Sequence, residues 1–343
     1  MRRQKEPAKN ISIKDVAKLA GVSISTVSRV INKNSAVKGR NRSQVLEAVK
    51  QLNYQPSVFA QRLATGKSNV VALVIPRYEG IFYSFYALEL IRGIGTLCEA
   101  LKLDLLLHLT DTKTSLNLKG VGGIIFADLI GNKQQLEEAL GSGAPTIVIN
   151  NYVDDPDVNC IAIDNAGGAK NAVKYLIGLK HHLIAHISGD LITQAASKRL
   201  EGYEAALRES KISPPAGFIV KTDYSRGQAR LAAEKLLKLS RPPTAIFTAS
   251  DSMALEVMAV ARELGVRIPQ DLSIVGFDDN PSGLYGPVAL TTVRQPLIKM
   301  AQESVKELSL LMGVTKKPKA KKIILPTELI IRESCQAIGS SRN

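Results

Sequence analysis

The feature that most limits the possible folds of this chain is a regular alternation of apolar runs and amphipathic segments that begins at residue 69. Short apolar runs such as 70–75 have the composition of strands buried on both faces of a parallel sheet. Segments with apolar residues three or four positions apart, such as 84–101, separate most of these runs and predict helices. Strands and helices that alternate in this way favour doubly wound parallel α/β sheets with right-handed crossovers. Because about 265 residues are many for one such sheet, we expect two lobes with a cleft between them.

The further strands that this pattern predicts are 103–109, 121–126, 145–150, 158–163, 183–188, 217–221, 244–248 and 272–277. The further helices that it predicts are 133–140, 166–179, 196–210, 225–240, 252–264 and 297–312.

The first 68 residues differ from the rest of the chain in charge. They hold 14 Lys and Arg against 3 Asp and Glu, a net charge of +11, whereas the other 275 residues hold 31 against 28, a net charge of +3. A small segment this cationic attracts the phosphates of a nucleic acid or the anionic surface of a membrane. The sequence has neither an apolar run long enough to span a bilayer nor the apolar region of a secretory signal. We therefore expect DNA as the partner, no membrane, and a cytoplasmic protein. The scattered Cys98, Cys160 and Cys335 fit such a reducing compartment.

Two short helices about a glycine turn are expected in this cationic segment. Ser12 followed by Asp15 predicts the start of the first helix, and Gly21 predicts its end. Ser23 can then cap a second helix, 24–31, by accepting from a backbone N–H two or three positions on. The polar side of the second helix carries small side chains and one arginine. This pattern is typical of a helix-turn-helix whose second helix enters a DNA major groove. A plain αα-hairpin in a larger helical domain has the same pattern, and the local charge favours the DNA-binding interpretation.

A third helix, 41–52, is expected to complete a small helical domain. Its apolar side and those of the first two helices predict a miniature core of Val16, Ala20, Val27, Val30, Val45, Leu46 and Val49. Such a core is too small to give much stability alone. Pro56 and Gly66 bound a further segment of about two helical turns, which is mostly unfolded in isolation and is therefore a candidate hinge.

Several ordered motifs together resemble the lactose-repressor (LacI/GalR) family of bacterial transcription regulators, over about 11–334. They are 13–23 (IKDVAKLAGVS), 26–32 (TVSRVIN), 45–49 (VLEAV), 52–56 (LNYQP), 60–66 (AQRLATG), 92–94 (RGI), 199–203 (RLEGY), 251–255 (DSMAL), 273–279 (SIVGFDD), 290–295 (LTTVRQ) and 326–334 (PTELIIRES).

The resemblance implies an all-α helix-turn-helix headpiece joined by a hinge helix to a two-lobed α/β core like a periplasmic sugar-binding protein. It also implies a homodimer on a pseudo-palindromic operator, switched by a small, carbohydrate-like effector. The expected boundaries are 1–56 for the headpiece, 57–68 for the hinge helix and linker, and 69–343 for the core. Within the core we expect a first lobe of 69–163 and 296–322 and a second lobe of 164–293 and 323–335.

The resemblance also implies roles for single residues in DNA binding. Ile24, Ser25 and Arg29 occupy the base-reading positions of the second helix, where an arginine can bond guanine O6 and N7. The residues expected to contact phosphates are Thr26, Ser28 and Asn32. Leu63 aligns with a leucine that family members insert into the minor groove, which would kink the DNA there. Packing of Leu63 against the core is the alternative.

In the core, Arg199, Tyr224 and Asp278 match effector-contact positions of the family. Asn150 stands where many members have Asp, and Ser250 replaces a frequent Asn. The full set of predicted effector residues is Phe82, Tyr86, Asn150, Arg199, Tyr224, Ser250, Asp251 and Asp278. The segment 110–119 is shorter than the helix usual at this point of the family, so one crossover of the first lobe is expected to be a loop.

Signals of catalysis are weak. No P-loop, dinucleotide fingerprint or nucleophile elbow is present. His181, His182 and His186 lie where a strand begins, and a period of two gives no shared helical face for a metal pair, so we expect them at the surface. We therefore expect no enzyme, no cofactor and no metal. A transport binding protein would share the core but not the cationic headpiece. Regulation by a protein partner, or DNA binding independent of any ligand, remains an alternative.

Overall fold

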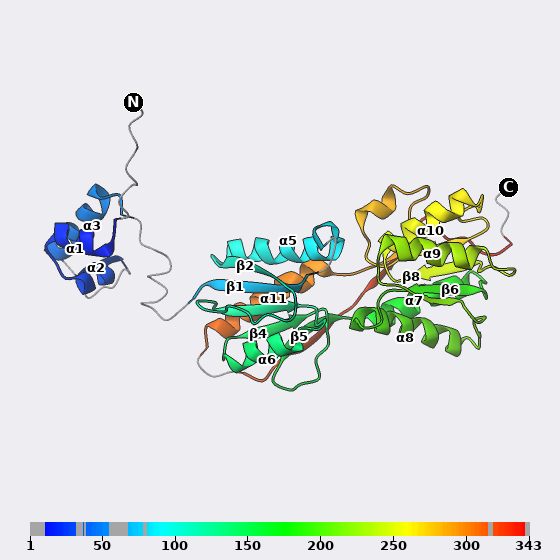
Figure 1. Cartoon of the computed structure of the whole chain (residues 1–343), viewed down its shortest axis with the longest axis horizontal. Helices are drawn as coiled ribbons and strands as arrows, with labels where there is room; N and C mark the ends of the chain where they lie inside the picture. The colour runs from blue at the N-terminus through cyan, green and yellow to red at the C-terminus, as the bar shows by residue number, and fades with distance from the viewer. Residues whose placement is uncertain are drawn as a thin grey trace, which may run out of the picture. The chain divides into compact units, whose positions relative to one another are not determined.

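The computed structural model describes residues 11–31, 37, 39–54, 68–77, 81–314 and 318–339. The chain divides into two compact units, residues 1–69 and 70–343 (Figure 1). The predicted residues Asn32 and Leu63 and nearly all of the predicted hinge 57–68 lie outside the described residues.

The first unit is a bundle of three short helices, α1 (Ile13–Ala20), α2 (Ile24–Ile31) and α3 (Arg40–Gln51). Ser12 and Asp15 form the expected start of α1, since the Asp15 carboxylate accepts from the Ser12 backbone N–H at 2.8 Å. Gly21 ends α1 with φ +66°, a left-handed conformation that glycine adopts without strain. The core consists of Val16, Ala17, Ala20, Val27, Val30, Val45 and Ala48.

One predicted member of that core is wrong. Leu46 is 52% exposed on α3, whereas Ala48 is buried. The first two helices pack against the stripe of α3 that carries Val45 and Ala48, positions three apart, and this turns Leu46 to solvent.

In the second unit, the first lobe is built on a six-stranded, entirely parallel sheet in the order β11-β5-β4-β3-β1-β2. Its strands are β1 (Val70–Pro76), β2 (Asp104–Thr110), β3 (Gly123–Ala127), β4 (Thr146–Ile149), β5 (Asn159–Ile163) and β11 (Lys322–Leu325). Helices α5 (Phe85–Ala100) and α11 (Leu297–Met312) cover one face, and α6 (Lys133–Gly141) covers the other. A short 3-10 helix, η1 (Ile81–Tyr83), precedes α5.

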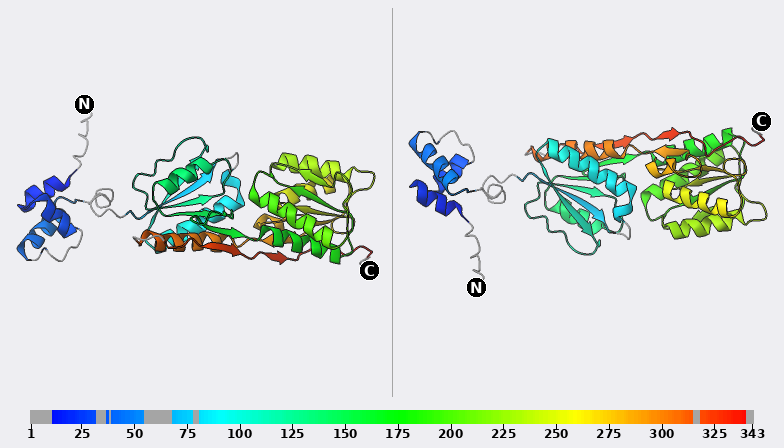
Figure 2. Two further views of the ribbon diagram at one scale, coloured as in Figure 1. Left: turned by 90° about the horizontal axis from the view of Figure 1, so that it is seen from below. Right: turned by 90° about the horizontal axis from the view of Figure 1, so that it is seen from above.

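The second lobe is built on a four-stranded parallel sheet in the order β7-β6-β8-β9. Its strands are β6 (Ile184–Ser188), β7 (Ile219–Lys221), β8 (Ala245–Thr248) and β9 (Ser273–Val275). Helices α7 (Asn165–Gly178) and α8 (Gln194–Glu209) lie on one face, and α9 (Arg226–Leu237) and α10 (Asp251–Glu263) lie on the other (Figure 2). A 3-10 helix, η2 (Pro281–Leu284), follows β9.

Three connections join the two lobes within the described part of the chain: 163–165, 294–297 and 325–328. Two of them adjoin a small antiparallel pair of strands, since 294–297 follows β10 (Thr292–Arg294) and 325–328 precedes β12 (Glu328–Ile330). β11 pairs with β5, so the first lobe extends to Leu325, and the boundary predicted at residue 322 is wrong. In Figure 1 the last, red part of the chain runs from the first lobe along to the second.

The connection from β2 to β3 contains no helix, in agreement with the sequence. Leu116, Leu118 and Val121 of this loop pack against Ala72, Val74, Ile124 and Phe126 of the sheet. The loop therefore supplies apolar cover to a face where a helix would otherwise lie.

Candidate functional site

The outer face of α2 is the first candidate site. Ser23 caps the helix by accepting from the Thr26 backbone N–H at 3.2 Å, as the sequence predicted. Val27 and Val30 are buried, and this orientation leaves Ile24, Ser25 and Arg29 exposed on the opposite side, with Thr26 and Ser28 half-buried beside them.

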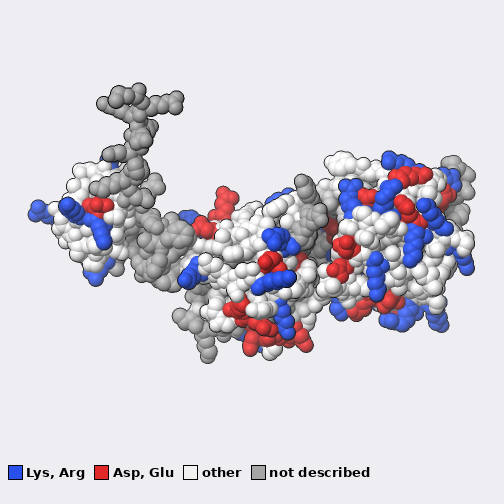
Figure 3. All heavy atoms as spheres, viewed as in Figure 1, with Lys and Arg blue, Asp and Glu red and all other residues white. Residues whose placement is uncertain are grey.

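The charge of this unit is also concentrated. Its described residues hold six Lys and Arg against two Asp and Glu. In the view of Figure 3, Lys and Arg on the three-helix unit outnumber Asp and Glu, whereas both signs are mixed over the second unit. A small helix face with one arginine, on a cationic unit, has the shape and charge to read a DNA groove.

The second candidate site lies between the lobes of the core, at the carboxyl ends of their strands. Asp128 and Asn150 follow β3 and β4, whereas Tyr224 and Asp278 follow β7 and β9. All four have positive φ, at +69°, +65°, +68° and +127°. Such backbone conformations cost on the order of 1–3 kcal/mol in non-glycine residues and cluster at functional sites. Ligands of doubly wound sheets also bind at the carboxyl ends of the strands.

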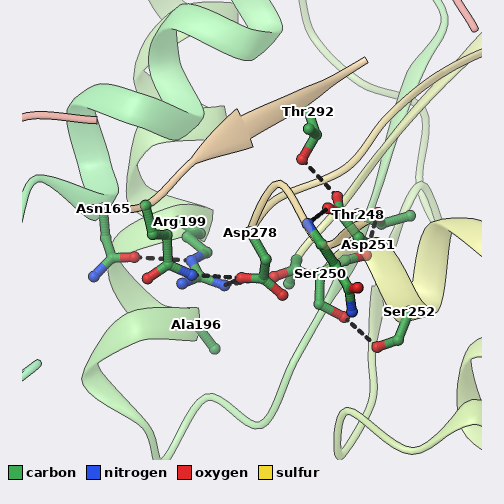
Figure 4. A network of polar contacts seen from close by, with 12 residues as sticks. Asn165, Ala196, Arg199, Thr248, Ser250, Asp251, Ser252, Asp278 and Thr292 are labelled. Carbon is green, nitrogen blue, oxygen red and sulfur yellow. Dashed lines mark hydrogen bonds and ion pairs between the residues drawn. The ribbon is translucent and has the colours of Figure 1, made fainter. Parts of the chain in front are cut away.

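Arg199 of α8 is the central cation of this cleft and is only 4% exposed. Its Nε donates to Asn165 Oδ1 at 2.8 Å (Figure 4). Its Nη1 donates to the Ala249 carbonyl at 2.5 Å. The guanidinium stacks 3.8 Å from the ring centre of Phe277, and its Nη1 lies 3.8 Å from Asp278 Oδ1. These contacts fix the position of the guanidinium before any ligand arrives.

Asp278 faces Arg199 and accepts a hydrogen bond from Gln295 Nε2. Burial raises the pKa of Asp278 to about 6, although Arg199 and Gln295 act in the opposite direction. The carboxylate is therefore mostly ionised above neutral pH and can accept from a ligand.

Asp251 does not face the cleft as predicted. It is 1% exposed, and its two oxygens accept from the Thr292 hydroxyl at 2.5 Å and the Asn280 backbone N–H at 2.7 Å. Burial, and then the nearby Asp278, raise the pKa of Asp251 to about 8. Its geometry makes Asp251 a positioning residue that ties α10 to the loops bearing Asp278 and Thr292.

Ser250 has a local role at the start of α10. It is 5% exposed, and its hydroxyl accepts from the Met253 backbone N–H at 3.4 Å as the N-cap of α10. The same hydroxyl lies 3.0 Å from the Ser252 hydroxyl (Figure 4).

The first lobe contributes a carboxylate that the sequence had not singled out. Asp128 Oδ1 accepts from Asn150 Nδ2 at 2.6 Å, and the nearby Tyr86 hydroxyl acts to lower the pKa of the same carboxyl. Burial raises the pKa of Asp128 to about 6, and Arg199 of the other lobe lowers it. The two lobes therefore bring Asp128 and Arg199 within electrostatic reach of each other. Phe82, in contrast, is 58% exposed at η1.

Tyr224 closes the cleft from the second lobe. A Cβ atom on Gly189 would lie 2.1 Å from the Tyr224 ring, so only glycine allows the ring to lie there. Burial raises the pKa of Tyr224, while the charges of Arg199, Asp278 and Asp128 all act on its hydroxyl. The charged residues that act on this hydroxyl belong to both lobes.

A side-chain bridge spans the lobes beside these residues. Gln194, the first residue of α8, accepts from the Tyr152 backbone N–H at 2.6 Å and donates to the Tyr152 carbonyl at 3.0 Å. A cavity of about 490 Å³ opens here, lined by residues of both lobes. They are Leu129, Asn151, Tyr152, Val153, Asp154, Leu191, Ile192, Thr193, Gln194 and Ser197.

Four cleft residues were missed at the level of sequence: Asp128, Asn165, Phe277 and Gln295. The position of Asp128 directly after a predicted strand could have indicated it. Asn165 and Gln295 lie at connections between the lobes, and only the tertiary structure shows which residues they meet.

Of the three histidines predicted at the surface, His182 is exposed, but His181 and His186 are buried. His186 is fully buried between the rings of Tyr203 and Phe247, whose centres lie 5.1 and 4.9 Å away. His181 is 3% exposed and bonds Thr244 Oγ1 and the Gln336 carbonyl, each at 3.0 Å. His186 lies in the central strand β6, and His181 lies just before that strand. Helices cover both faces of this sheet, which explains why both side chains are buried. Within the described ranges, no group of three or more His, Cys, Asp or Glu residues could hold a metal ion.

Two family models match this chain. Residues 12–57 match the family described as bacterial regulatory proteins, lacI family, and residues 173–335 match a periplasmic binding protein-like domain. Catabolite control protein A of Priestia megaterium is 35% identical over 315 residues, which are 89% of this chain and 93% of the relative. The chain belongs to the lacI family of bacterial regulatory proteins. It is also 34% identical to the HTH-type transcriptional regulator DegA of Bacillus subtilis (strain 168), over 96% of this chain and 99% of DegA.

Solved structures of two transcription regulators agree with the fold. The Lac repressor dimer bound to operator and the anti-inducer ONPF has a TM-score of 0.81 and 26% identity, covering 96% of this chain and 100% of that one. The complex of the transcriptional regulator CelR with cellobiose has a TM-score of 0.71 and 26% identity, covering 94% and 99%.

The family confirms the predicted fold class: a helix-turn-helix domain with a two-lobed, periplasmic-binding-protein-like core. This lacI-family chain is a DNA-binding transcription regulator, and the family consists of regulators rather than enzymes. No helix in the described part of the chain is long and apolar enough to cross a bilayer.

Proposed function

We propose that this lacI-family protein is a cytoplasmic repressor that binds a pseudo-palindromic operator as a homodimer. In this proposal, a carbohydrate-like effector binds between the two lobes and changes the affinity for the operator. The observation that carries the proposal is the cleft at the strand ends, where fixed Arg199 of the second lobe faces Asp278 and lies within electrostatic reach of Asp128. Two solved relatives support it: the Lac repressor is a dimer bound to operator, and CelR is in complex with cellobiose.

On the DNA side, we assign base reading to the exposed Ile24, Ser25 and Arg29 of α2. Thr26 and Ser28, at the edge of the same face, are proposed to bond phosphates and set the register of the helix. The roles proposed for Asn32, Leu63 and the hinge 57–68 concern residues outside the described ranges and stay predictions from the sequence.

On the effector side, we assign direct contacts to Arg199, Asp278, Asn150 and Tyr224, with Tyr86 and Phe82 at the edge of the cleft. A charged group in a buried site gives strong hydrogen bonds to a ligand hydroxyl. An effector changes operator affinity only if it binds the DNA-competent arrangement of the lobes with a different affinity from the other arrangement. Operator must then change effector affinity by the same factor.

The test begins by selecting an operator from random-sequence DNA with the full-length protein. Operator Kd is then measured with and without each compound that raises the melting temperature of the protein. We expect at least one such compound to change operator Kd tenfold or more. Asp278→Asn should keep operator binding and lose most of that response, while exposed Asp157→Asn in the first lobe should behave as wild type. If no compound that binds the cleft changes operator Kd, the effector switch is refuted and control by a protein partner becomes the better hypothesis.

A further inference from the structure

Lys322, the first residue of β11, holds one loop of the first lobe through its charge. Its ammonium donates to three backbone carbonyls of that loop, those of Val153 at 2.5 Å, Asp155 at 2.6 Å and Val158 at 2.6 Å. A lysine ammonium has three N–H donors, so these carbonyls use all of them. Backbone carbonyls converge in a similar way on a bound Ca²⁺ ion. Lys322 therefore brings to this loop, on its own side chain, the positive charge that a metal ion brings to such a site.

The loop 151–158 has few other means of support. It connects β4 to β5 and contains neither helix nor strand. Residues 154–157 are all exposed, whereas Val153 and Val158 on either side pack against the first sheet. The contacts of Lys322 therefore join the exposed middle of the loop to its two packed ends and to β11.

The same loop carries the first-lobe half of the bridge between the lobes. Tyr152 directly precedes Val153 and shares two hydrogen bonds with Gln194 of the second lobe. Tyr152 and Val153 also line the cavity between the lobes. Lys322 itself lies three residues before the connection 325–328. One ammonium thus links a connection between the lobes to a wall of the cavity between them.

We propose that Lys322 is a positioning residue, a built-in cation that fixes the cavity wall 151–154 and thereby favours closure of the lobes. This inference goes beyond the proposed function, because it concerns the chain without effector or DNA. Hydrogen bonds from a charged donor are stronger than those between neutral groups, so the three carbonyls hold the ammonium firmly. Without that charge the three oxygens face one another with no donor between them, and the loop should move to find other partners.

Lys322→Met tests the proposal, because methionine keeps most of the apolar length of the side chain and has no charge. In the full-length protein without DNA, we expect amide exchange at Tyr152 and Val158 to rise about tenfold or more, since both amides donate hydrogen bonds that depend on the loop. Lys321→Met is the matched control, because Lys321 stands one residue earlier and its Nζ bonds Glu307 of α11 at 2.6 Å. Unchanged exchange in Lys322→Met, or an equal rise in both variants, overturns the proposal.

Chemical rescue separates the charge of Lys322 from its packing. Lys322→Ala leaves space in which a small alkylammonium ion can bind the same carbonyls. Ethylammonium chloride should return the exchange at Tyr152 and Val158 towards the wild-type rate. Tetramethylammonium chloride at the same concentration should not, because this ion has the same charge but no N–H donor. Equal recovery in the two salts, or none in ethylammonium, would show that the loop does not depend on a hydrogen-bonding cation.

The link to closure is tested in a second background by X-ray scattering. If Lys322 acts through the bridge between Tyr152 and Gln194, Lys322→Met should enlarge the radius of gyration of the wild type and add little to that of Gln194→Ala. The same enlargement in both backgrounds, or none in either, refutes a role of Lys322 in closure through this bridge. Neither measurement involves an effector or operator DNA, so these outcomes leave the proposed function to its own test.

Discussion

At the scale of single residues, the two candidate sites achieve their geometry in different ways. Arg29 is exposed and free to adapt to a base edge, whereas Arg199 is buried and held by Asn165, Ala249 and Phe277. A flexible arginine suits recognition in a wet groove. A fixed one suits a cleft that must bind without first ordering its own side chain.

Replacing Arg29 by Ala tests base reading. A forked arginine–guanine contact is worth about 1–3 kcal/mol of discrimination, so Arg29→Ala should weaken binding to the selected operator by that amount per half-site and relax the preference at one base pair. Kd values for operator and for random DNA are compared at one salt concentration. Lys50→Ala on α3 serves as the control, and equal losses on both DNAs would show that Arg29 contacts only phosphate.

Asp251 should make the core less stable as the pH rises. Its pKa is about 8 in the folded state against an ordinary value of 3.8, so the folded state holds the proton more tightly than the unfolded chain. The resulting stabilisation is complete below pH 3.8 and is lost as the pH rises through 8. Asp128 and Asp278, with pKa values of about 6, are already mostly ionised at pH 6.5. Between pH 6.5 and 8 we therefore expect the ionisation of Asp251 to lower the free energy of unfolding by roughly 1–2 kcal/mol.

Urea unfolding of the core at pH 6.5 and pH 8.0 measures this loss. Asp251→Asn should remove most of the difference between the two pH values, because an amide does not titrate. Asp157→Asn should keep the wild-type difference. A wild-type core that becomes more stable over this range would contradict a protonated Asp251.

At the scale of elements, the pattern of apolar residues was sufficient for every long helix of the core. α5, α7, α8 and α11 begin and end within two residues of the predicted bounds, because each has an apolar stripe and most have a capping residue at the start. Three-residue strands such as β10 and β12 carry too few residues for a period to be recognised. β11 was assigned to the wrong lobe because its pairing with β5, about 160 positions earlier, depends on topology that local pattern does not contain.

The same limit applies to the candidate site. Motifs indicated Arg199, Asp278 and Tyr224, and the structure brings them together. It could not be foreseen that Asp251 would be enclosed by Thr292 and Asn280, since those contacts join three separate elements.

The start of α8 should control how closely the lobes approach. Gln194→Ala removes both hydrogen bonds to the Tyr152 backbone, whereas Ser197→Ala, one turn along the same cavity wall, removes none of those bonds. We expect faster amide exchange at Tyr152 and a larger radius of gyration by X-ray scattering for Gln194→Ala alone. If amide exchange and scattering are unchanged in Gln194→Ala, the two hydrogen bonds between Gln194 and Tyr152 do not help to hold the lobes together.

At the scale of the whole molecule, the two units differ greatly in the size of their cores. Seven small side chains fill the core of the three-helix unit as far as its described residues go, whereas the lobes share clusters of large aliphatic and aromatic residues. The free energy of unfolding grows with the apolar surface that a domain buries. We therefore expect the three-helix unit to have a lower free energy of unfolding than the core.

Calorimetry of the full-length protein should therefore show two transitions. We expect a small transition of the three-helix unit at the lower temperature, and selected operator DNA should raise it because DNA binds only the folded helices. Random-sequence DNA at the same concentration is the control and should raise it less. A single transition with and without DNA would contradict separate unfolding of the two units.

The late position of β11 and β12 in the chain has a consequence for synthesis. β11 completes the first sheet, β12 pairs with β10, and the Ser334 carbonyl accepts from the Ile274 backbone N–H at the end of the second sheet. On the ribosome, neither lobe can finish folding until the segment 322–336 has emerged, while the three-helix unit is complete after residue 54. A nascent chain that stops early would thus expose apolar strand edges, which proteases and chaperones recognise. Degradation of such truncated chains would remove molecules that could still bind DNA through the three-helix unit but could no longer respond to a metabolite.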